Sequence, residues 1–213
     1  TEKDPEISAY ETISWKINEF HDVEFFPGKI TRVYLISNQY RDMKSILKQL
    51  ETDDDSHKNP ENQNTIAIDL EWEYTKLCLI QFCSNNICII IRLFTDEDIQ
   101  NHQELNQQQE NEENLINKNN EILSNFLNTH KFYGKGMHND KKMLLSYFGS
   151  TFSNNLEDIE KTRLAANDLS RNFNQMTLQF AGEPTATFKV IEMTKSDWSL
   201  PELSFRQVLY AAF

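Results

Sequence analysis

The stretch that decides the fold is Thr65-Ile-Ala-Ile-Asp-Leu-Glu-Trp-Glu73. Its β-branched and apolar residues predict a β-strand. Asp69 and Glu71 interrupt the apolar pattern, and residues two apart on a strand point to the same face. Two carboxylates on a partly buried face repel each other and lose hydration, so they need a compensating charge. Hard cations such as Mg²⁺ or Mn²⁺ prefer carboxylate oxygen. An exposed edge strand with two solvated acids is the alternative that this pair alone leaves open.

The neighbouring segments predict a hairpin set. After the first strand, residues 76–83 and 87–93 have strand patterns, and the two connections are short enough for turns. Upstream, Lys29 to Ile36 alternates as a strand does. A short amphipathic helix follows that strand, because apolar residues recur there at helical spacing. Its apolar positions are Met43, Ile46, Leu47 and Leu50.

The second half of the chain reads as mostly helical. Apolar residues between Ile122 and Leu127 predict a helix, Lys131 to Met137 a fourth strand, and Asp140 to Gly149 a helix that glycine ends. Residues 155–182 are predicted to be mostly helical. We expect the last helix to begin at a capping box of Ser204 and Gln207. The whole order predicts an α/β protein with a mixed sheet and helices packed on it.

Composition adds a strong but localised negative charge. The chain has 213 residues and a net charge of −12. Residues 1–24, 51–61 and 96–124 together carry −16, so the remainder carries +4. We interpret 1–28 as an acidic N-terminal extension that is not a signal peptide. Residues 51–64 and 101–120 are interpreted as polar insertions, either solvated loops or sites for a protein partner.

Cysteine usage indicates the compartment. The three cysteines, Cys78, Cys83 and Cys88, are an odd number and show no C-x-x-C spacing. That pattern is typical of buried thiols in a reducing environment rather than of disulfides or a zinc site. We therefore expect an intracellular protein of the nucleus or cytoplasm, with the nucleus favoured. No apolar run approaches the roughly 20 residues that a membrane-spanning helix needs.

Four further residues carry possible chemistry. Asp140 lies at the predicted start of a helix, where it could simply stabilise the helix N-terminus. His138 and Asn139 beside it are either loop polar groups or substrate contacts. Tyr210 lies on the last helix and could be a partly buried packing residue. Asp140 and Tyr210, each taken alone, favour the structural interpretation.

Taken together, the motifs resemble one family. Asp69-x-Glu71, Gly134-x-Gly136-x-x-x-Asp140 and Leu209-Tyr-Ala-Ala occur in the order found in the DEDD-type 3′–5′ exonucleases. The resemblance is to the subgroup with a tyrosine in its third motif, the RNase D and Werner-syndrome-exonuclease-like enzymes. It covers roughly residues 30–213. It implies a ribonuclease H-like mixed sheet with helices on both faces, and an exonuclease-like domain over 29–213.

The resemblance also implies roles for individual residues. Asp69 would bridge two Mg²⁺ or Mn²⁺ ions, Glu71 would bind one ion and Asp140 the other, and Tyr210 would orient the attacking water. The substrate would be a single-stranded 3′ end of DNA or RNA. The expected nucleic-acid contacts are Leu70, Trp72, His138, Asn139 and Lys189. Trp72 is equally compatible with a core position, since it should point away from Glu71.

One departure leaves a second function open. The family pattern places an aspartate four residues after its tyrosine, and this sequence ends at Phe213. Either the chain continues beyond this sequence or the protein lacks the fourth carboxylate. The alternative to an exonuclease is therefore an inactive exonuclease-fold module that binds nucleic acid or a protein.

Overall fold

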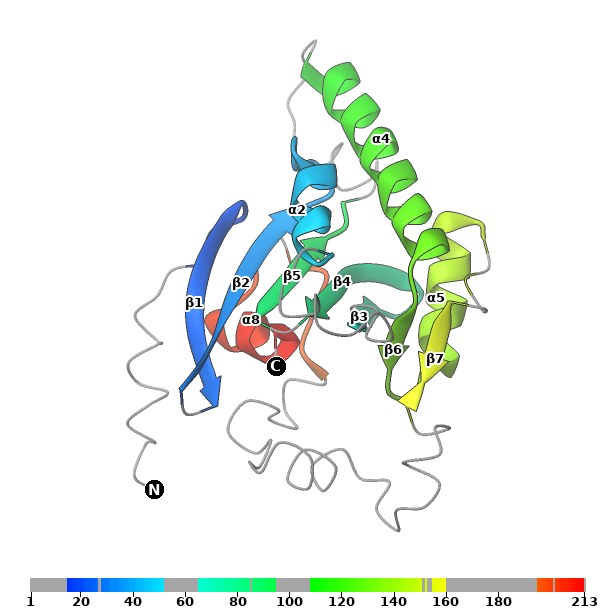
Figure 1. The fold of residues 1–213 in the computed structure, drawn as a ribbon. Helices are drawn as coiled ribbons and strands as arrows, with labels where there is room; N and C mark the ends of the chain where they lie inside the picture. The colour runs from blue at the N-terminus through cyan, green and yellow to red at the C-terminus, as the bar shows by residue number, and fades with distance from the viewer. Residues whose placement is uncertain are drawn as a thin grey trace.

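A computed structural model describes residues 15–26, 28–51, 65–84, 86–94, 108–150, 152, 155–159, 195–200 and 202–212. Strands and helices are interspersed along the chain (Figure 1). In order, they are β1 (Glu19–Phe26), β2 (Lys29–Ser37), α2 (Met43–Gln49), β3 (Ile66–Glu73), β4 (Lys76–Ser84), β5 (Ile87–Arg92), α4 (Gln108–Thr129), β6 (Phe132–Gly134), α5 (His138–Phe148), β7 (Leu156–Asp158) and α8 (Phe205–Ala212).

The strands form one mixed sheet of seven, in the order β1-β2-β5-β4-β3-β6-β7. β3, β4 and β5 are consecutive antiparallel neighbours, as the sequence predicts. β6 pairs parallel to β3, with Ile66 opposite Phe132 and Ala67 opposite Tyr133. The predicted hairpin set and the parallel fourth strand are both confirmed. β6 itself is shorter than the predicted segment.

Helices cover both faces of the sheet, so the predicted fold class is confirmed (Figure 1). One core lies under α2, α4 and α5 and contains Ile68, Leu70 and Phe82 with Leu123 and Leu144. The other lies under α8, where Val208 and Leu209 pack with strand residues. Alternate residues of each strand supply the two cores, because successive side chains point to opposite faces.

The predicted insertion at 101–120 is wrong for residues 108–120, which belong to the long helix α4. Ile116 and Asn119 are buried on the face that Leu123 continues. The Asn119 amide donates to the carbonyls of Asn38 and Tyr40, at 2.8 and 2.9 Å. Asn119 thus takes a core position that an apolar residue would usually fill, because its amide is hydrogen-bonded. The sequence of this segment therefore lacks the apolar spacing of a helix.

Two other predictions need correction. Leu156–Asp158 forms the edge strand β7, not a helix, and pairs parallel to β6. β1 lies inside the predicted N-terminal extension but pairs antiparallel to β2, so this part of the extension belongs to the sheet. Val23 of β1 is completely buried, which explains why the strand joins the core. Residues 52–64, 101–107 and 160–194 lie outside the described residues, so predictions there stay predictions.

Within the described part of the chain, no helix combines the length and apolar character that crossing a membrane requires.

The capping box that begins α8 is confirmed. The Gln207 backbone N–H donates to Ser204 Oγ at 3.3 Å, and the Ser204 N–H donates to Gln207 Oε1 at 2.9 Å. Gln207 Nε2 also donates to the Asp197 carbonyl at 2.9 Å. This reciprocal pair satisfies two N–H groups that a helix start leaves unpaired, and it anchors α8 to the preceding loop.

We expect Ser204→Ala to lower the free energy of unfolding by about 1 kcal/mol, because the Gln207 N–H loses its acceptor. Ser204→Asp, which keeps an acceptor oxygen at the cap, should retain most of the stability. Urea denaturation monitored by circular dichroism measures both. An alanine variant as stable as the wild type would show that the cap hydroxyl contributes nothing here.

Candidate active site

Strand β3 presents its two carboxylates on the face where α8 packs. Ile68 and Leu70 enter the opposite core, so Asp69 and Glu71 point the other way. The Asp69 side chain is exposed, and its Oδ1 accepts a hydrogen bond from the Leu70 N–H at 3.0 Å. The pairing of β3 with β4 shifts register between Glu71 and Trp72. Such bulges re-aim side chains and are common beside active sites.

A glycine lets the next element approach β3 closely. A Cβ on Gly134, the last residue of β6, would lie 2.7 Å from the Ile68 carbonyl oxygen. Only glycine fits that gap without movement of the strand. The chain then turns through Gly136, whose φ of 68° favours glycine, and enters α5. This turn brings Asp140, in the first turn of α5, beside Asp69.

Asp140 is buried, and its carboxyl resists ionisation. Its side chain is 4% exposed, and no side chain caps α5. Burial, followed by the negative charges of Asp69 and Asp158, raises the pKa of Asp140 to about 7. A residue that only stabilised the helix N-terminus would have a lowered pKa. The raised pKa therefore favours a functional position over the capping interpretation.

Tyr210 reaches the same carboxylates from α8. Burial, followed by the charges of Glu71 and Asp69, raises the pKa of its phenol to about 12. Its ring lies 5.9 Å from the ring of buried Trp198, centroid to centroid. The small residues Ala211 and Ala212 follow it, and both are buried against the sheet. The tyrosine hydroxyl thus stays protonated near neutral pH, beside two acids.

The four predicted catalytic residues therefore come from β3, α5 and α8, and electrostatic coupling links Asp69 to both Asp140 and Tyr210. Their donors are all oxygen and carry excess negative charge, which suits a hard divalent cation. Among the described residues, no three acidic, histidine or cysteine side chains are grouped closely enough to hold an ion. The donor chemistry fits a metal, and coordination would require these side chains to turn toward each other.

The predicted nucleic-acid contacts divide into three groups. Leu70 is 3% exposed in the core opposite Asp69, so its side chain is not available to a nucleotide at that face. Trp72 packs against the same core, which agrees with the alternative prediction of a core position. His138 and Asn139 are exposed at the start of α5, next to Asp140. Lys189 lies outside the described residues.

Sequence reasoning missed Asp158. Its Oδ1 accepts a hydrogen bond from the Gly136 N–H at 3.1 Å, across the β6–β7 pair. This bond holds the turn that leads into α5, and the charge of Asp158 acts on Asp140. A helical interpretation of residues 155–182 gave no reason to place Asp158 near the site. A short edge strand of three residues leaves little periodic signal to find.

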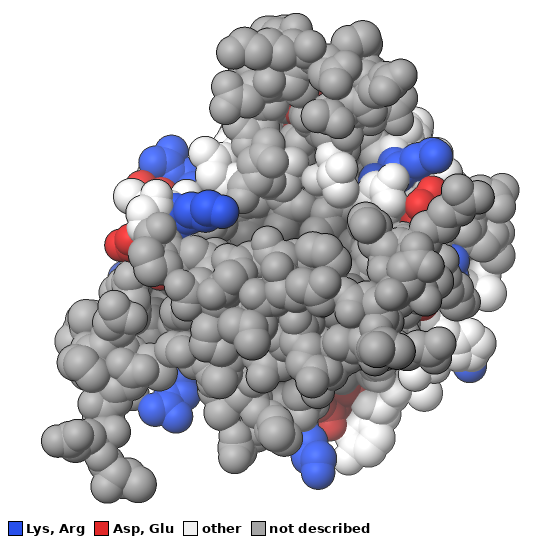
Figure 2. All heavy atoms as spheres, turned by 60° about the horizontal axis from the view of Figure 1, so that its bottom comes forward, with Lys and Arg blue, Asp and Glu red and all other residues white. Residues whose placement is uncertain are grey.

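Basic side chains do not gather over the face in Figure 2. The lysines and arginines that the structure describes stand apart from one another there, and acidic side chains lie beside several of them. On this face, the described residues form no continuous basic patch of the kind that attracts nucleic-acid backbones.

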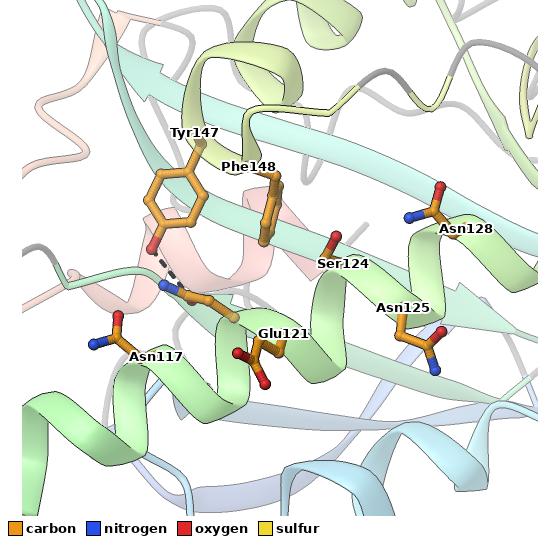
Figure 3. Close-up of a pocket in the computed structure, with 8 residues that line it drawn as sticks. Asn117, Glu121, Ser124, Asn125, Asn128, Tyr147 and Phe148 are labelled. Carbon is orange, nitrogen blue, oxygen red and sulfur yellow. Dashed lines mark hydrogen bonds between the residues drawn. The ribbon is translucent and has the colours of Figure 1, made fainter.

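A separate groove lies between α4 and the end of α5 (Figure 3). Its volume is about 580 Å³, and amide side chains of α4 face an aromatic pair of α5. Tyr147 Oη donates to Asn120 Oδ1 at 3.4 Å across it. None of the predicted site residues lines it. Its lining is Asn117, Asn120, Glu121, Ser124, Asn125, Asn128, Tyr147 and Phe148.

Comparison with known proteins places this architecture among exonuclease domains. No protein-family model matches the sequence, and no curated protein matches it either. The structure is similar to Escherichia coli RNase D, an exoribonuclease, with a TM-score of 0.50 and 17% identity over 83% of this chain. It is also similar to the EXO domain of Aedes aegypti Nibbler, with a TM-score of 0.50 and 15% identity over 90% of this chain.

The catalytic core of Trypanosoma brucei RRP6 is a third similar structure, with a TM-score of 0.52 and 14% identity over 96% of this chain. The matches span 40% of RNase D, 47% of the RRP6 core and 84% of the Nibbler domain. At these identities the comparisons establish the fold alone. The seven-stranded mixed sheet with its helices has the ribonuclease H-like architecture of 3′–5′ exonuclease domains.

Proposed function

We propose that this protein is a metal-dependent 3′–5′ exonuclease of the tyrosine-containing DEDD type. The observation that carries the proposal is the coupling of Asp69 to both Asp140 and Tyr210. Asp69 and Asp140 are 71 positions apart in the sequence, and Asp140 and Tyr210 are 70 apart. The three residues come from three elements of an exonuclease-type fold. A fold used only as a scaffold has no chemical need to bring them together.

Asp69, Glu71 and Asp140 would hold two Mg²⁺ or Mn²⁺ ions. When bound, such ions activate water and stabilise the charge on the leaving oxygen. The crowding at Asp140 supports this assignment, because its carboxyl keeps a proton up to pH 7 unless a cation replaces that proton. Asp158 acts differently, since its Oδ1 already accepts from the Gly136 backbone.

Tyr210 would orient the attacking water rather than deprotonate it. A phenol whose pKa is raised to about 12 holds its proton at neutral pH, so its hydroxyl can donate or accept a hydrogen bond but is a poor base. His138 and Asn139 stand exposed beside Asp140 and would contact the terminal nucleotide of a single-stranded DNA or RNA 3′ end. Lys189 would meet phosphate. An intracellular location, with the nucleus favoured, completes the proposal.

A binding module without activity is the second candidate. The net charge of −12 and the absence of a ready-made group of three metal donors among the described residues favour it. In that case the acidic segments would contact a protein partner. Metal binding separates the candidates, because an inactive module has no requirement for a cation at Asp69.

We expect the protein to bind Mn²⁺ with millimolar or tighter affinity, and Asp69→Asn to weaken that binding at least tenfold, because the variant loses the shared carboxylate charge. Isothermal titration calorimetry measures both. Asp22→Asn is the control, since Asp22 pairs with Arg32 at 2.8 Å on another edge of the sheet. Equal Mn²⁺ binding by wild type and Asp69→Asn would refute the metal site.

The raised pKa of Asp140 predicts an unusual pH dependence. The unfolded carboxyl ionises near pH 3.8 but the folded one only near 7, so the metal-free protein should lose stability as pH rises between these values. Asp140→Asn should remove this loss and be more stable than wild type at pH 8. Urea denaturation at pH 5 and pH 8 in a chelating buffer tests it. If the wild type is more stable than Asp140→Asn at pH 8, the Asp140 carboxyl does not have a raised pKa in the folded protein.

Activity is tested on end-labelled single-stranded DNA and RNA. Because the family pattern has an acid four residues after its tyrosine, the assay uses a chain continued past Phe213 with Asp, and with Asn as the matched control. We expect stepwise 3′–5′ degradation with Mn²⁺ or Mg²⁺ by the Asp form. Tyr210→Phe should slow it roughly 10- to 100-fold with little loss of binding, and Asp69→Ala should abolish it.

Intact DNA and RNA after incubation with the Asp-continued chain, under conditions where it binds Mn²⁺, would rule out the enzyme and leave the binding module.

A further inference from the structure

Gln81 is a buried amide that the fold leaves unsatisfied. It lies in the middle of β4, at the centre of the sheet, and is 1% exposed. Among the residues that the structure describes, neither its Nε2 nor its Oε1 has a hydrogen-bond partner. Its neighbours on the two adjacent strands are Asp69 of β3 and Ile90 of β5.

Such a side chain is costly. Leaving a buried donor or acceptor unpaired costs about 1–3 kcal/mol, whereas an apolar side chain of the same shape would avoid that cost. Nearly all buried polar groups in proteins are paired, so an unpaired amide needs a reason. The surroundings give no structural one, because Leu79 and Ile90 on the same face are apolar and fully buried.

The register aims Gln81 at the candidate site. Residues directly opposite in an antiparallel pair have Cβ atoms about 4.5–5.5 Å apart and share a face. Gln81 therefore lies beside Asp69, one strand closer to the centre of the sheet, on the face where α8 packs. Two residues further along β4, Cys83 Sγ lies 3.9 Å from the Ala212 carbonyl oxygen, so the end of α8 contacts this face of β4. The Gln81 amide is buried, whereas the Asp69 side chain beside it is exposed, so the pair lies where the buried face meets solvent.

We propose that Gln81 is a positioning residue for Asp69. Its amide N–H donates to the inner oxygen of the Asp69 carboxylate when the outer oxygen binds a divalent cation. This bond fixes the direction of the carboxylate and holds it against the repulsion of Asp140. Partners of this kind, one layer behind the ligands, commonly change metal affinity 10- to 100-fold. The inference rests on the proposed metal site, and it explains why β4 keeps an amide where an apolar residue would be more stable.

The test compares Gln81→Met with a matched control, Ser84→Ala. Methionine has nearly the shape of glutamine but cannot donate. Ser84 is also on β4, is 3% exposed, and has an unpartnered hydroxyl, but it lies an odd number of residues from Gln81 and so faces away from Asp69. Calorimetric titration with Mn²⁺ alone and urea denaturation of the metal-free protein give affinity and stability independently.

We expect Gln81→Met to bind Mn²⁺ about tenfold or more weakly while its metal-free stability equals or exceeds that of the wild type. Ser84→Ala should keep wild-type affinity. Wild-type Mn²⁺ affinity in Gln81→Met, with binding lost in Asp69→Asn, would overturn this inference and leave the metal site standing. Wild-type affinity in Asp69→Asn would instead overturn the metal site itself. A metal-free stability of Gln81→Met below that of wild type would also overturn the inference, because the amide would then be a packing group.

Discussion

The close approach of β6 to β3 is the constraint on which the candidate site depends. Parallel pairing places the end of β6 beside Ile68, and only a residue without a Cβ fits at Gly134. The chain must then turn at once into α5, and Asp140 arrives next to Asp69 with its carboxyl already buried. Backbone geometry therefore creates the electrostatic crowding, and the crowding is what makes a cation favourable at this position.

Local patterns predicted most of the sheet. β3, β4 and β5 are strands joined by short turns, so neighbouring residues determine their pairing. The α8 capping box is equally local, since Ser204 and Gln207 contact each other three positions apart. For Asp69, Asp140 and Tyr210 the residues alone were ambiguous. The resemblance to an exonuclease family singled them out, and the structure couples them.

The predictions failed where a tertiary contact replaces a periodic signal. Asn119 occupies a core position of α4 because carbonyls of the β2–α2 connection accept its amide hydrogens. No sequence window of α4 contains those carbonyls, so residues 108–120 look like a polar insertion. The three-residue strand β7 is fixed by pairing with β6 rather than by its own pattern. The family resemblance predicts Leu70 as a nucleotide contact, although strand alternation directs its side chain into the core.

The negative charge of the candidate site links cation binding to substrate binding. Asp69, Glu71, Asp140 and Asp158 are acidic, and the chain as a whole carries −12, so a phosphate group approaching the bare protein meets repulsion. In the exonuclease proposed above, binding the substrate first and recruiting a cation later would therefore cost free energy. The cation would neutralise the carboxylates before the phosphate binds or together with it. The raised pKa of Asp140 has the same origin, since a proton occupies the position that a cation would otherwise neutralise. Metal affinity, substrate affinity and the pH range of both should therefore change together when any of these carboxylates is altered.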